Sequence, residues 1–478
     1  MPEFYNIIGL LDHMGFGNMG DAAIHESFIE NIRKRVPSVR LVAFSENPND
    51  TSSRHNIRCY PIQWNYPGCW TSSAGVAPAD ASPVFRLKSL LKRRLNYLYL
   101  LAQYIRNAGR RIGHLRRTYY RVKSLDLLVI AGGGQLCELW GGSWSHPYNV
   151  CMFCALAKLS RTPVIIVGVG ADLLERSASK FFAKWSVRLA DYTSFRSLES
   201  HARIRALGVM KDAYVSPDPA YAINVRRYFA PDYPAEPVAR IRQSISRSSV
   251  GPSVTGGDCV NSQGSIRSRG RVGLNPMGFC DPRIWPRKDV AVYNSYLDKL
   301  VEFASWLISH NYSIELFTSD IVVDKYALED LYNRLCSFPA VSASSVVACH
   351  FASSLQDLLA QMAGFDFVVT TKFHGVVFSH LLAKPVIALS YLPKIDHLMK
   401  TVGHGQYCLT IEDFHTPRLI EAFESLAYNA ADLARLFRQT TTSYADALEA
   451  EFDLLFGAQK TIVKSVLYRG VSQQNAGR

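Results

Sequence analysis

Two basic side chains lie close together in the C-terminal half, within the segment Thr371–Gly375 (TKFHG). An apolar run predicts a strand at 365–370, directly before Lys372 and His374, and a helix is expected from about residue 376. On a continued strand these two residues point to the same side. A lysine binds anions, and an imidazole can hold and donate a proton near neutral pH. A lone histidine is more often structural, but this combination favours an anionic substrate with proton transfer by His374.

The first glycine-rich segment, residues 15–21 (GFGNMGD), joins a predicted strand at 6–10 to a predicted helix at 21–36. Asn18 and Asp21 stand at the start of this helix, where free N–H groups could bind an anion. The same residues equally suit a tight turn capped by Asp21. The spacing differs from the G-x-G-x-x-G dinucleotide fingerprint, so a dinucleotide site is not expected.

A second glycine-rich segment follows the most apolar N-terminal strand, predicted at 125–130. Three successive glycines, Gly132, Gly133 and Gly134, lose much conformational freedom on folding, which favours close approach of a ligand or a helix. Residues at the end of such a strand are often functional, and we favour a ligand-binding role for these glycines.

The glycines are followed by an acidic and aromatic stretch that could serve an acceptor. Glu138 or His146 could act as a base toward a hydroxyl group. Trp140 could stack on a sugar face, although it could equally pack beneath its own loop. Lys394 lies at the end of another predicted strand, 386–390, and adds a cation in the C-terminal half.

The composition is that of a globular protein with two or three domains, because 48% of the 478 residues are hydrophobic and 19% are charged. No apolar run reaches the ~18–20 residues needed to span a bilayer. The N-terminus lacks a signal-peptide pattern, so we expect a cytoplasmic protein. Ten cysteines in that setting are expected to be reduced. Cys151 and Cys154 form a CxxC without a second pair, which favours a buried helix face over a metal site.

The net charge of +13 comes from one segment, residues 86–123, which contains twelve Lys or Arg and no acid. The rest of the chain is almost neutral, with 41 Lys or Arg against 40 Asp or Glu. The segment is expected to form two helices separated near Gly109 and Gly113. It could be a solvated helical insert or an interfacial structure on anionic lipid. Nucleic-acid binding is not expected, because no nucleic-acid-binding motif accompanies the charge.

Apolar runs alternate with helix-period segments along most of the chain, which predicts an α/β fold with parallel sheets. The domains expected from this pattern are an N-terminal Rossmann-like domain (1–225) with the basic insert, a flexible linker (226–271), a C-terminal Rossmann-like domain (272–415) and a helical tail (416–478). Thirteen of the thirty residues at 242–271 are Ser or Gly, which supports the linker. Ligands bind at the carboxyl ends of parallel strands, so the site is expected in a cleft between the two domains.

Several motifs together resemble the polysaccharide pyruvyl transferase family over roughly residues 5–400. They are GNMGD, the GGG loop, GVGAD, FRSLES followed by VSPDPA, and KFHG followed by AKPVIALSYLPK. The resemblance implies two Rossmann-like domains facing across a cleft, similar to GT-B glycosyltransferases. It also implies transfer of the enolpyruvyl group of phosphoenolpyruvate to a sugar, commonly as a ketal bridging two hydroxyls, without a metal or other cofactor.

The resemblance implies roles for individual residues. His374 matches the family's C-terminal histidine, the general acid, and Lys372 stands where the family usually has an arginine that binds the donor. Arg196 matches the arginine of an RDxxS-like segment, and Asp218 matches the aspartate of the DPA segment. Two departures are Lys372 itself, which lacks the bidentate fork of arginine, and Leu198, which lies in a segment lacking the usual acid. With Lys372 and Arg196 on the donor's phosphate and carboxylate, the glycine loops would assist.

The resemblance also implies a sugar or lipid-linked oligosaccharide acceptor, at the inner face of the membrane. An alternative is a GT-B glycosyltransferase that uses a nucleotide sugar. That enzyme would need an acid at the ribose and a pocket for the base, and neither can be assigned. A third alternative is a non-catalytic basic surface protein, which would leave the glycine loops, Lys372 and His374 without a purpose.

Overall fold

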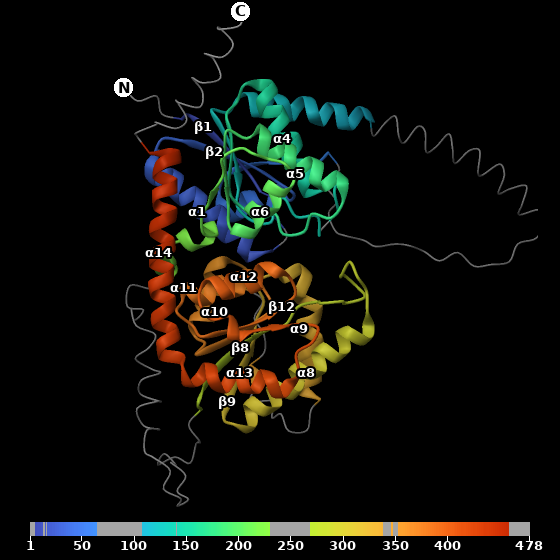
Figure 1. Cartoon of the computed structure of the whole chain (residues 1–478), viewed down its shortest axis with the longest axis vertical. Helices are drawn as coiled ribbons and strands as arrows, with labels where there is room; N and C mark the ends of the chain where they lie inside the picture. The colour runs from blue at the N-terminus through green and yellow to red at the C-terminus, as the bar shows by residue number, and fades with distance from the viewer. Residues whose placement is uncertain are drawn as a thin grey trace, which may run out of the picture.

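The structure is a computed structural model that describes residues 5–12, 15, 17–64, 108–139, 141–229, 268–337, 346–347 and 352–457. It contains two parallel sheets, one above the other in Figure 1, each flanked by helices. This confirms the predicted fold of two Rossmann-like α/β domains. Residues 230–267, which include most of the predicted linker, lie outside the described part.

The N-terminal sheet has the strand order β3-β2-β1-β4-β5-β6-β7, and all neighbouring strands are parallel. Its strands are β1 (Ile7–Leu11), β2 (Arg40–Ser45), β3 (Arg58–Pro61), β4 (Leu127–Ala131), β5 (Val164–Val169), β6 (Tyr192–Phe195) and β7 (Tyr214–Val215). In β4, Val129 and Ala131 pack into one hydrophobic cluster, while Leu128 and Ile130 pack into another on the opposite face. The continuous apolar run of this strand therefore reflects burial on both faces.

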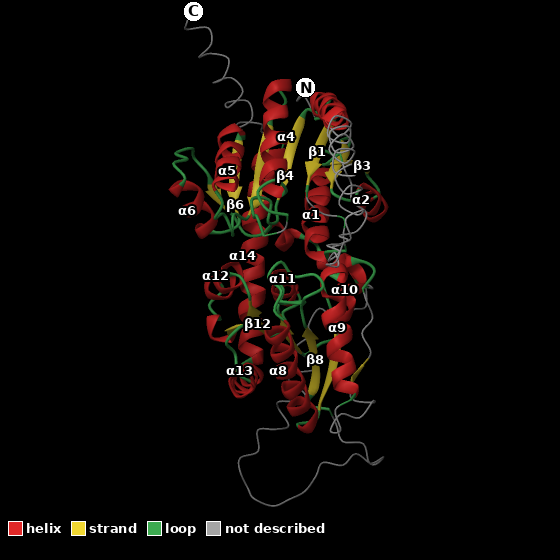
Figure 2. Cartoon of the chain, turned by 90° about the vertical axis from the view of Figure 1, so that its right-hand side faces the viewer, coloured by secondary structure: helices red, strands yellow, loops and turns green. Residues whose placement is uncertain are grey.

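Helices cover both faces of this sheet (Figure 2). One face carries α1 (Met19–Arg35) and the short helix η1 (Pro219–Ala222). The other carries the helix of residues 108–123 with α4, α5 and α6, whose buried side chains share one cluster. The bounds of the last three are α4 (His146–Ser160), α5 (Ser177–Leu189) and α6 (Leu198–Ala206).

The C-terminal sheet has the order β10-β9-β8-β11-β12-β13 and is also parallel. Its strands are β8 (Gly270–Asn275), β9 (Tyr312–Leu316), β10 (Val346–Val347), β11 (Phe367–Thr370), β12 (Val386–Ser390) and β13 (Cys408–Thr410). Its helices are α8 (Val290–Ser309), α9 (Ile321–Cys336), α10 (Leu355–Ala363), α11 (Phe373–Leu381), α12 (Pro393–Thr401) and α13 (Thr416–Tyr428).

The last described helix, α14 (Ala430–Phe456), runs along both domains (Figure 1). Near its end the Phe452 ring meets the Phe28 ring of α1 edge to face, with centroids 5.4 Å apart. Arg35 of α1 forms ion pairs of 3.1 Å with Glu449 and 2.7 Å with Asp453. The C-terminal tail therefore returns to the N-terminal domain and holds the two domains together.

Three local predictions differ from the structure. The helix after β11 begins at Phe373 rather than near 376, so Lys372 is its N-cap and His374 lies in its first turn; the two residues do not alternate on a strand. The helix of residues 108–123 continues through Gly113 instead of breaking there. The prediction also missed α2 (Pro48–His55), a polar helix that buries only two residues and so lacks an apolar period. Residues 86–107 lie outside the described part.

Candidate active site

The carboxyl-terminal ends of strands in the two sheets meet at the domain interface. The N–H of Met19, at the start of α1, donates a hydrogen bond of 2.8 Å to the carbonyl of Ser319, which follows β9. Asn18 and Asp320 form an antiparallel bridge beside it. Asn18 also caps α1 by accepting hydrogen bonds from two N–H groups of the first turn. The predicted Asn18 segment therefore joins the two domains while it starts α1.

His374 lies between the two domains with a side chain that is 12% exposed. Its ring presses against the backbone of α1, because a Cβ placed on Gly20 would lie 1.8 Å from His374 Nδ1. On its other side, Nε2 lies 3.8 Å from Oδ1 of Asp218, an ion-pair distance beyond hydrogen-bond length. The glycine in the GNMGD segment therefore makes room for the histidine of the other domain.

Asp218 links His374 to Arg196. One terminal nitrogen of Arg196 is 3.0 Å from Asp218, and the other is 2.8 Å from Asp172. Burial would raise the pKa of Asp218, but His374 and Arg196 outweigh it and lower the pKa to about 2. Burial of Arg196 would lower its pKa, but the two carboxylates raise it. The guanidinium of Arg196 also lies over the ring of Phe373, 4.6 Å from its centroid. Helix α11 therefore contacts Arg196 through Phe373 and approaches Asp218 through His374.

Lys372 has a side chain that is 12% exposed and has two carboxylate partners of its own. Its ammonium lies 3.2 Å from Asp320 and 2.9 Å from Asp324. These carboxylates raise the pKa of Lys372 despite its burial. Burial and the charge of Asp320 raise the pKa of Asp324 to about 7, although Lys372 opposes the shift. The two cations expected to bind the donor are thus both engaged with aspartates.

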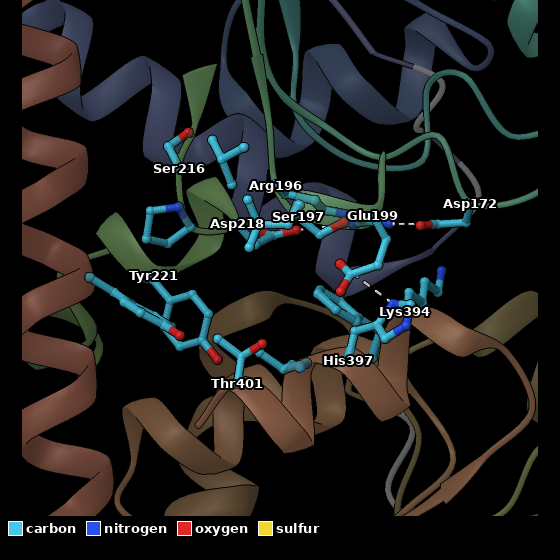
Figure 3. A pocket seen from close by; sticks show the side chains of 16 residues that line it. Asp172, Arg196, Ser197, Glu199, Ser216, Asp218, Tyr221, Lys394, His397 and Thr401 are labelled. Carbon is cyan, nitrogen blue, oxygen red and sulfur yellow. Dashed lines mark hydrogen bonds and ion pairs between the residues drawn. The ribbon is translucent and has the colours of Figure 1, made fainter. Parts of the chain in front are cut away.

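Lys394, in the first turn of α12, stands differently. No carboxylate of the described residues lies within 4 Å of its ammonium, which is 5.7 Å from the centroid of the Phe373 ring. It lines a cavity of about 240 Å³ between the domains (Figure 3). Lys394 is therefore available to an anion in this cavity.

The cavity lies beside the loops that follow β5, β6 and β7 and is bounded below by α12 (Figure 3). Glu199 of α6 and His397 of α12 approach within 3.5 Å across its edge. Tyr221 of η1 donates to or accepts from His380 of α11 at 2.8 Å, a second link between the domains. The residues that line the cavity are Asp172, Arg196, Ser197, Leu198, Glu199, Val215, Ser216, Pro217, Asp218, Tyr221, Phe373, Lys394, His397, Leu398, Thr401 and Tyr444.

The GGG loop approaches a helix closely. Gly132 and Gly133 have φ angles of 44° and 69°, which favour glycine. A Cβ on Gly132 would lie 2.7 Å from the side chain of Ile24 in α1. The N–H of Gly132 donates to the carbonyl of Val167 at 2.8 Å, so it is not free for a donor anion, contrary to expectation. For Gly132 the close approach is to a helix.

Asp21, in the first turn of α1, has its carboxylate beside the GGG loop, because a Cβ on Gly133 would lie 3.7 Å from its Oδ1. A Cβ on Gly134 would make only an ordinary contact, with Cys137. Burial raises the pKa of Asp21, a shift that His374 opposes. Asp21 therefore adds a second aspartate, after Asp218, to the surroundings of His374.

The predicted acceptor residues after the glycines differ in their relation to the site, because the charge of His146, like that of His374, opposes the rise in the pKa of Asp21, whereas Glu138 serves another element. Glu138 is buried and accepts hydrogen bonds from the N–H groups of Glu175 at 3.1 Å and Arg176 at 3.3 Å. It therefore holds the start of α5, which leaves little reason to keep it as a base. His146 lies in the first turn of α4, 3.5 Å from Glu46. Trp140 lies outside the described residues.

Sequence reasoning missed the carboxylates that pair with the site's cations. Asp172 and Asp320 each follow the carboxyl end of a strand, as Asp218 does, and that position was the available signal. Asp324, in the first turn of α9, carried no such signal. In the part of the chain that the structure describes, no group of three His, Cys, Asp or Glu side chains is arranged to hold a metal ion. The expectation of a metal-independent reaction stays a prediction.

Comparisons with known proteins agree with this architecture. Residues 18–393 match the family model described as polysaccharide pyruvyl transferase. A search of curated proteins finds no match. Among solved structures, a Listeria monocytogenes protein assigned as a UDP-N-acetylglucosamine 2-epimerase has 10% identity and a TM-score of 0.54, covering 93% of this chain and 94% of its own. The S. aureus MnaA–UDP structure has 9% identity and a TM-score of 0.51, with the same coverage. These likenesses show the GT-B-like fold alone.

Proposed function

Because the chain belongs to the polysaccharide pyruvyl transferase family, we propose that it transfers the enolpyruvyl group of phosphoenolpyruvate to a sugar. The product would be a pyruvate ketal on an exopolysaccharide or another cell-surface glycan precursor. The observation that carries this proposal is the His374–Asp218–Arg196 array, which both domains build together at the interface.

The array suits the proton transfer that the reaction needs. His374 protonates the methylene carbon of phosphoenolpyruvate, which leaves positive charge at the central carbon for a sugar hydroxyl to attack. The attacking hydroxyl gives its proton back to His374 as the first C–O bond forms. Phosphate then leaves, and a second hydroxyl closes the ketal as its proton passes to the released phosphate. The negative charge of Asp218 stabilises the imidazolium that must exist before proton donation. Asp218 stays ionised for this role because its pKa is about 2.

We assign the donor's anionic groups to Arg196 and Lys394. Arg196 lines the cavity and has five N–H donors, of which its two aspartates use only part. Lys394 adds an ammonium without a carboxylate within 4 Å among the described residues. Lys372, which was expected to bind the donor, either adds its positive charge from behind Asp320 and Asp324 or holds the loop after β11 to the start of α9. The donor contacts of Asn18, Asp21, Gly133 and Gly134 remain a prediction.

The test is to incubate the purified protein separately with phosphoenolpyruvate or a nucleotide sugar, together with a panel of sugar glycosides. Release of phosphate from phosphoenolpyruvate, with a pyruvate ketal detected by mass spectrometry, supports the proposal. Release of nucleotide instead would identify a glycosyltransferase. Release of neither would favour a non-catalytic surface protein. His374→Ala is the control that should abolish phosphate release.

The acceptor and the location are part of the same proposal. We propose a sugar or lipid-linked oligosaccharide acceptor at the cytoplasmic face of the membrane, with no resident cofactor and no nucleic-acid partner. No helix in the described part of the chain is long and apolar enough to cross a membrane.

A further inference from the structure

Three neighbouring helices on one face of the N-terminal sheet contain no acidic residue, whereas α6 on the same face contains Glu199. The helix of residues 108–123, α4 and α5 pack side by side on the same side of the sheet, with buried residues in one cluster. Together they contain ten Lys or Arg and no Asp or Glu. These are Arg110, Arg111, Arg116, Arg117, Arg121, Lys123, Lys158, Lys180, Lys184 and Arg188. Lys158 is ion-paired with Asp191, which follows α5. We call the outward side of these three helices the basic helical face.

Helix α5 shows the character of this face most clearly. Its outward residues include Lys180, Phe181, Lys184, Trp185 and Arg188, which all fall within about 140° of the helix circumference. The side chains of Phe181 and Trp185 are 54% and 39% exposed. Cations and aromatic rings thus share the exposed arc with one serine, Ser177, and with no acidic residue of α5.

The aromatic rings continue from α5 toward the domain interface. Trp144, in the loop that follows β4, is 68% exposed, and its ring lies 5.2 Å from that of Phe182. Phe182 neighbours Phe181, and Phe181 neighbours Trp185 at 6.2 Å. Several large aromatic rings exposed to water in one patch are unfavourable in free energy, and burying the rings against a partner or a lipid surface removes that cost.

Aliphatic side chains are exposed on the same face. Ile112 of the helix at residues 108–123 is 67% exposed, and Leu159 at the end of α4 is 72% exposed. Other apolar residues of α4, such as Met152 and Leu156, are half-buried. Aliphatic groups add nothing to recognition of a nucleic acid backbone, but they favour insertion among lipid acyl chains.

We infer that the basic helical face docks on the surface of an anionic lipid bilayer. Lys and Arg would bind the headgroups, while Trp144, Phe181 and Trp185 would insert at the interface, as aromatic residues do at membrane boundaries. The sequence had assigned a membrane role to residues 86–123 alone; α4 and α5 extend it. The inference does not depend on the proposed reaction. If that reaction is correct, the face would bring the cleft near a lipid-linked acceptor.

The test is co-sedimentation of the full chain with vesicles of phosphatidylcholine containing 30% phosphatidylglycerol, at low salt. We expect the variant Lys180→Gln/Lys184→Gln/Arg188→Gln to bind at least tenfold more weakly than wild type. The variant Phe181→Ala/Trp185→Ala should also bind more weakly. The charge control is Lys325→Gln/Arg418→Gln/Arg435→Gln, and the apolar control is Tyr428→Ala/Leu454→Ala, all exposed in the C-terminal half. Both controls should bind like wild type.

Insertion is measured separately by quenching of tryptophan fluorescence with brominated lipid. Wild type should be quenched, and Trp144→Phe/Trp185→Phe should lose most of that quenching while still sedimenting with vesicles. The inference is overturned if wild type does not bind anionic vesicles at low salt, or if the α5 charge variant binds like its control. Binding to duplex DNA or an anionic polysaccharide through the same residues, without vesicle binding, would also overturn it and identify a polyanion site.

Discussion

Replacing Asp218 with asparagine tests whether its charge supports His374 across the domain interface. The substitution keeps the shape of the side chain and an oxygen that can still accept the 3.0 Å hydrogen bond from the N–H of Ala220. It removes the charge 3.8 Å from His374 Nε2. At an effective dielectric constant of about 20, two unit charges at that distance attract by roughly 4 kcal/mol.

If that attraction stabilises protonated His374, losing it would lower the reaction rate by as much as about 10³-fold. Allowing for relaxation of the site, we expect kcat to fall on the order of 10²–10³-fold. Binding of phosphoenolpyruvate should not weaken, because the substitution removes a negative charge that competes for Arg196. This separation of turnover from donor binding is the signature of a role in proton transfer.

The assay is phosphate release at saturating phosphoenolpyruvate, combined with calorimetric titration of the donor. Glu199→Gln is the matched control, because it makes the same change at the cavity edge and Glu199 contacts His397 instead. It should change kcat less than about threefold, since no contact with the reacting groups is lost. The thermal unfolding midpoint of Glu199→Gln should stay near that of wild type. Asp218→Asn should lower the midpoint, because Arg196 loses one of its two buried carboxylate partners, so kcat is compared at a temperature well below both midpoints. The reasoning is refuted if Asp218→Asn keeps near-normal turnover, or if the control loses as much.

Three further predictions concern donor binding, the histidine's packing and pH. Lys394→Ala should weaken phosphoenolpyruvate binding in calorimetry by about tenfold or more. Lys372→Ala should mainly lower the thermal unfolding midpoint, because it leaves two buried carboxylates without a cation. The opposite pattern would restore Lys372 as the residue that binds the donor. Gly20→Ala should displace the ring of His374 and abolish most turnover without unfolding the protein, since the added Cβ would lie 1.8 Å from Nδ1, and turnover like wild type would show that the ring can move freely. The pKa of Asp324 is raised to about 7, so the folded state keeps this proton at pH values where the unfolded state has lost it. Asp324 therefore makes the free energy of unfolding fall as the pH rises from about 4 to 7. Asp324→Asn should flatten this fall, measured by urea unfolding at several pH values, and an unchanged pH dependence would contradict the raised pKa of Asp324.

Much of the fold could be predicted from local pattern. The strand predicted at 386–390 agrees with the structure to the residue, and the strands predicted at 6–10 and 125–130 lie within two residues of β1 and β4, because each is a clear apolar run. The parallel arrangement followed from alternating strands and helices. Helices that bury little, such as α2, left no such signal and were missed.

The sequence by itself also determined which residues gather at the interface. His374 was expected there because it follows a predicted strand, and the carboxyl ends of parallel strands collect at one edge of a sheet. Arg196 and Asp218 were expected from the family resemblance, and the structure shows that they too follow strands, β6 and β7. The sequence could not say which charges would neutralise one another.

Only the tertiary structure decided the pairing. Arg196 meets Asp172 and Asp218 because β5, β6 and β7 are neighbours in one sheet, and Lys372 meets Asp320 because β9 and β11 flank β8 in the other. The contact between Gly20 and His374 exists only because two domains pack against each other. Strand order and domain packing follow from the burial of many side chains at once, whereas periodicity is a local property, so these contacts leave no mark in the sequence around either partner.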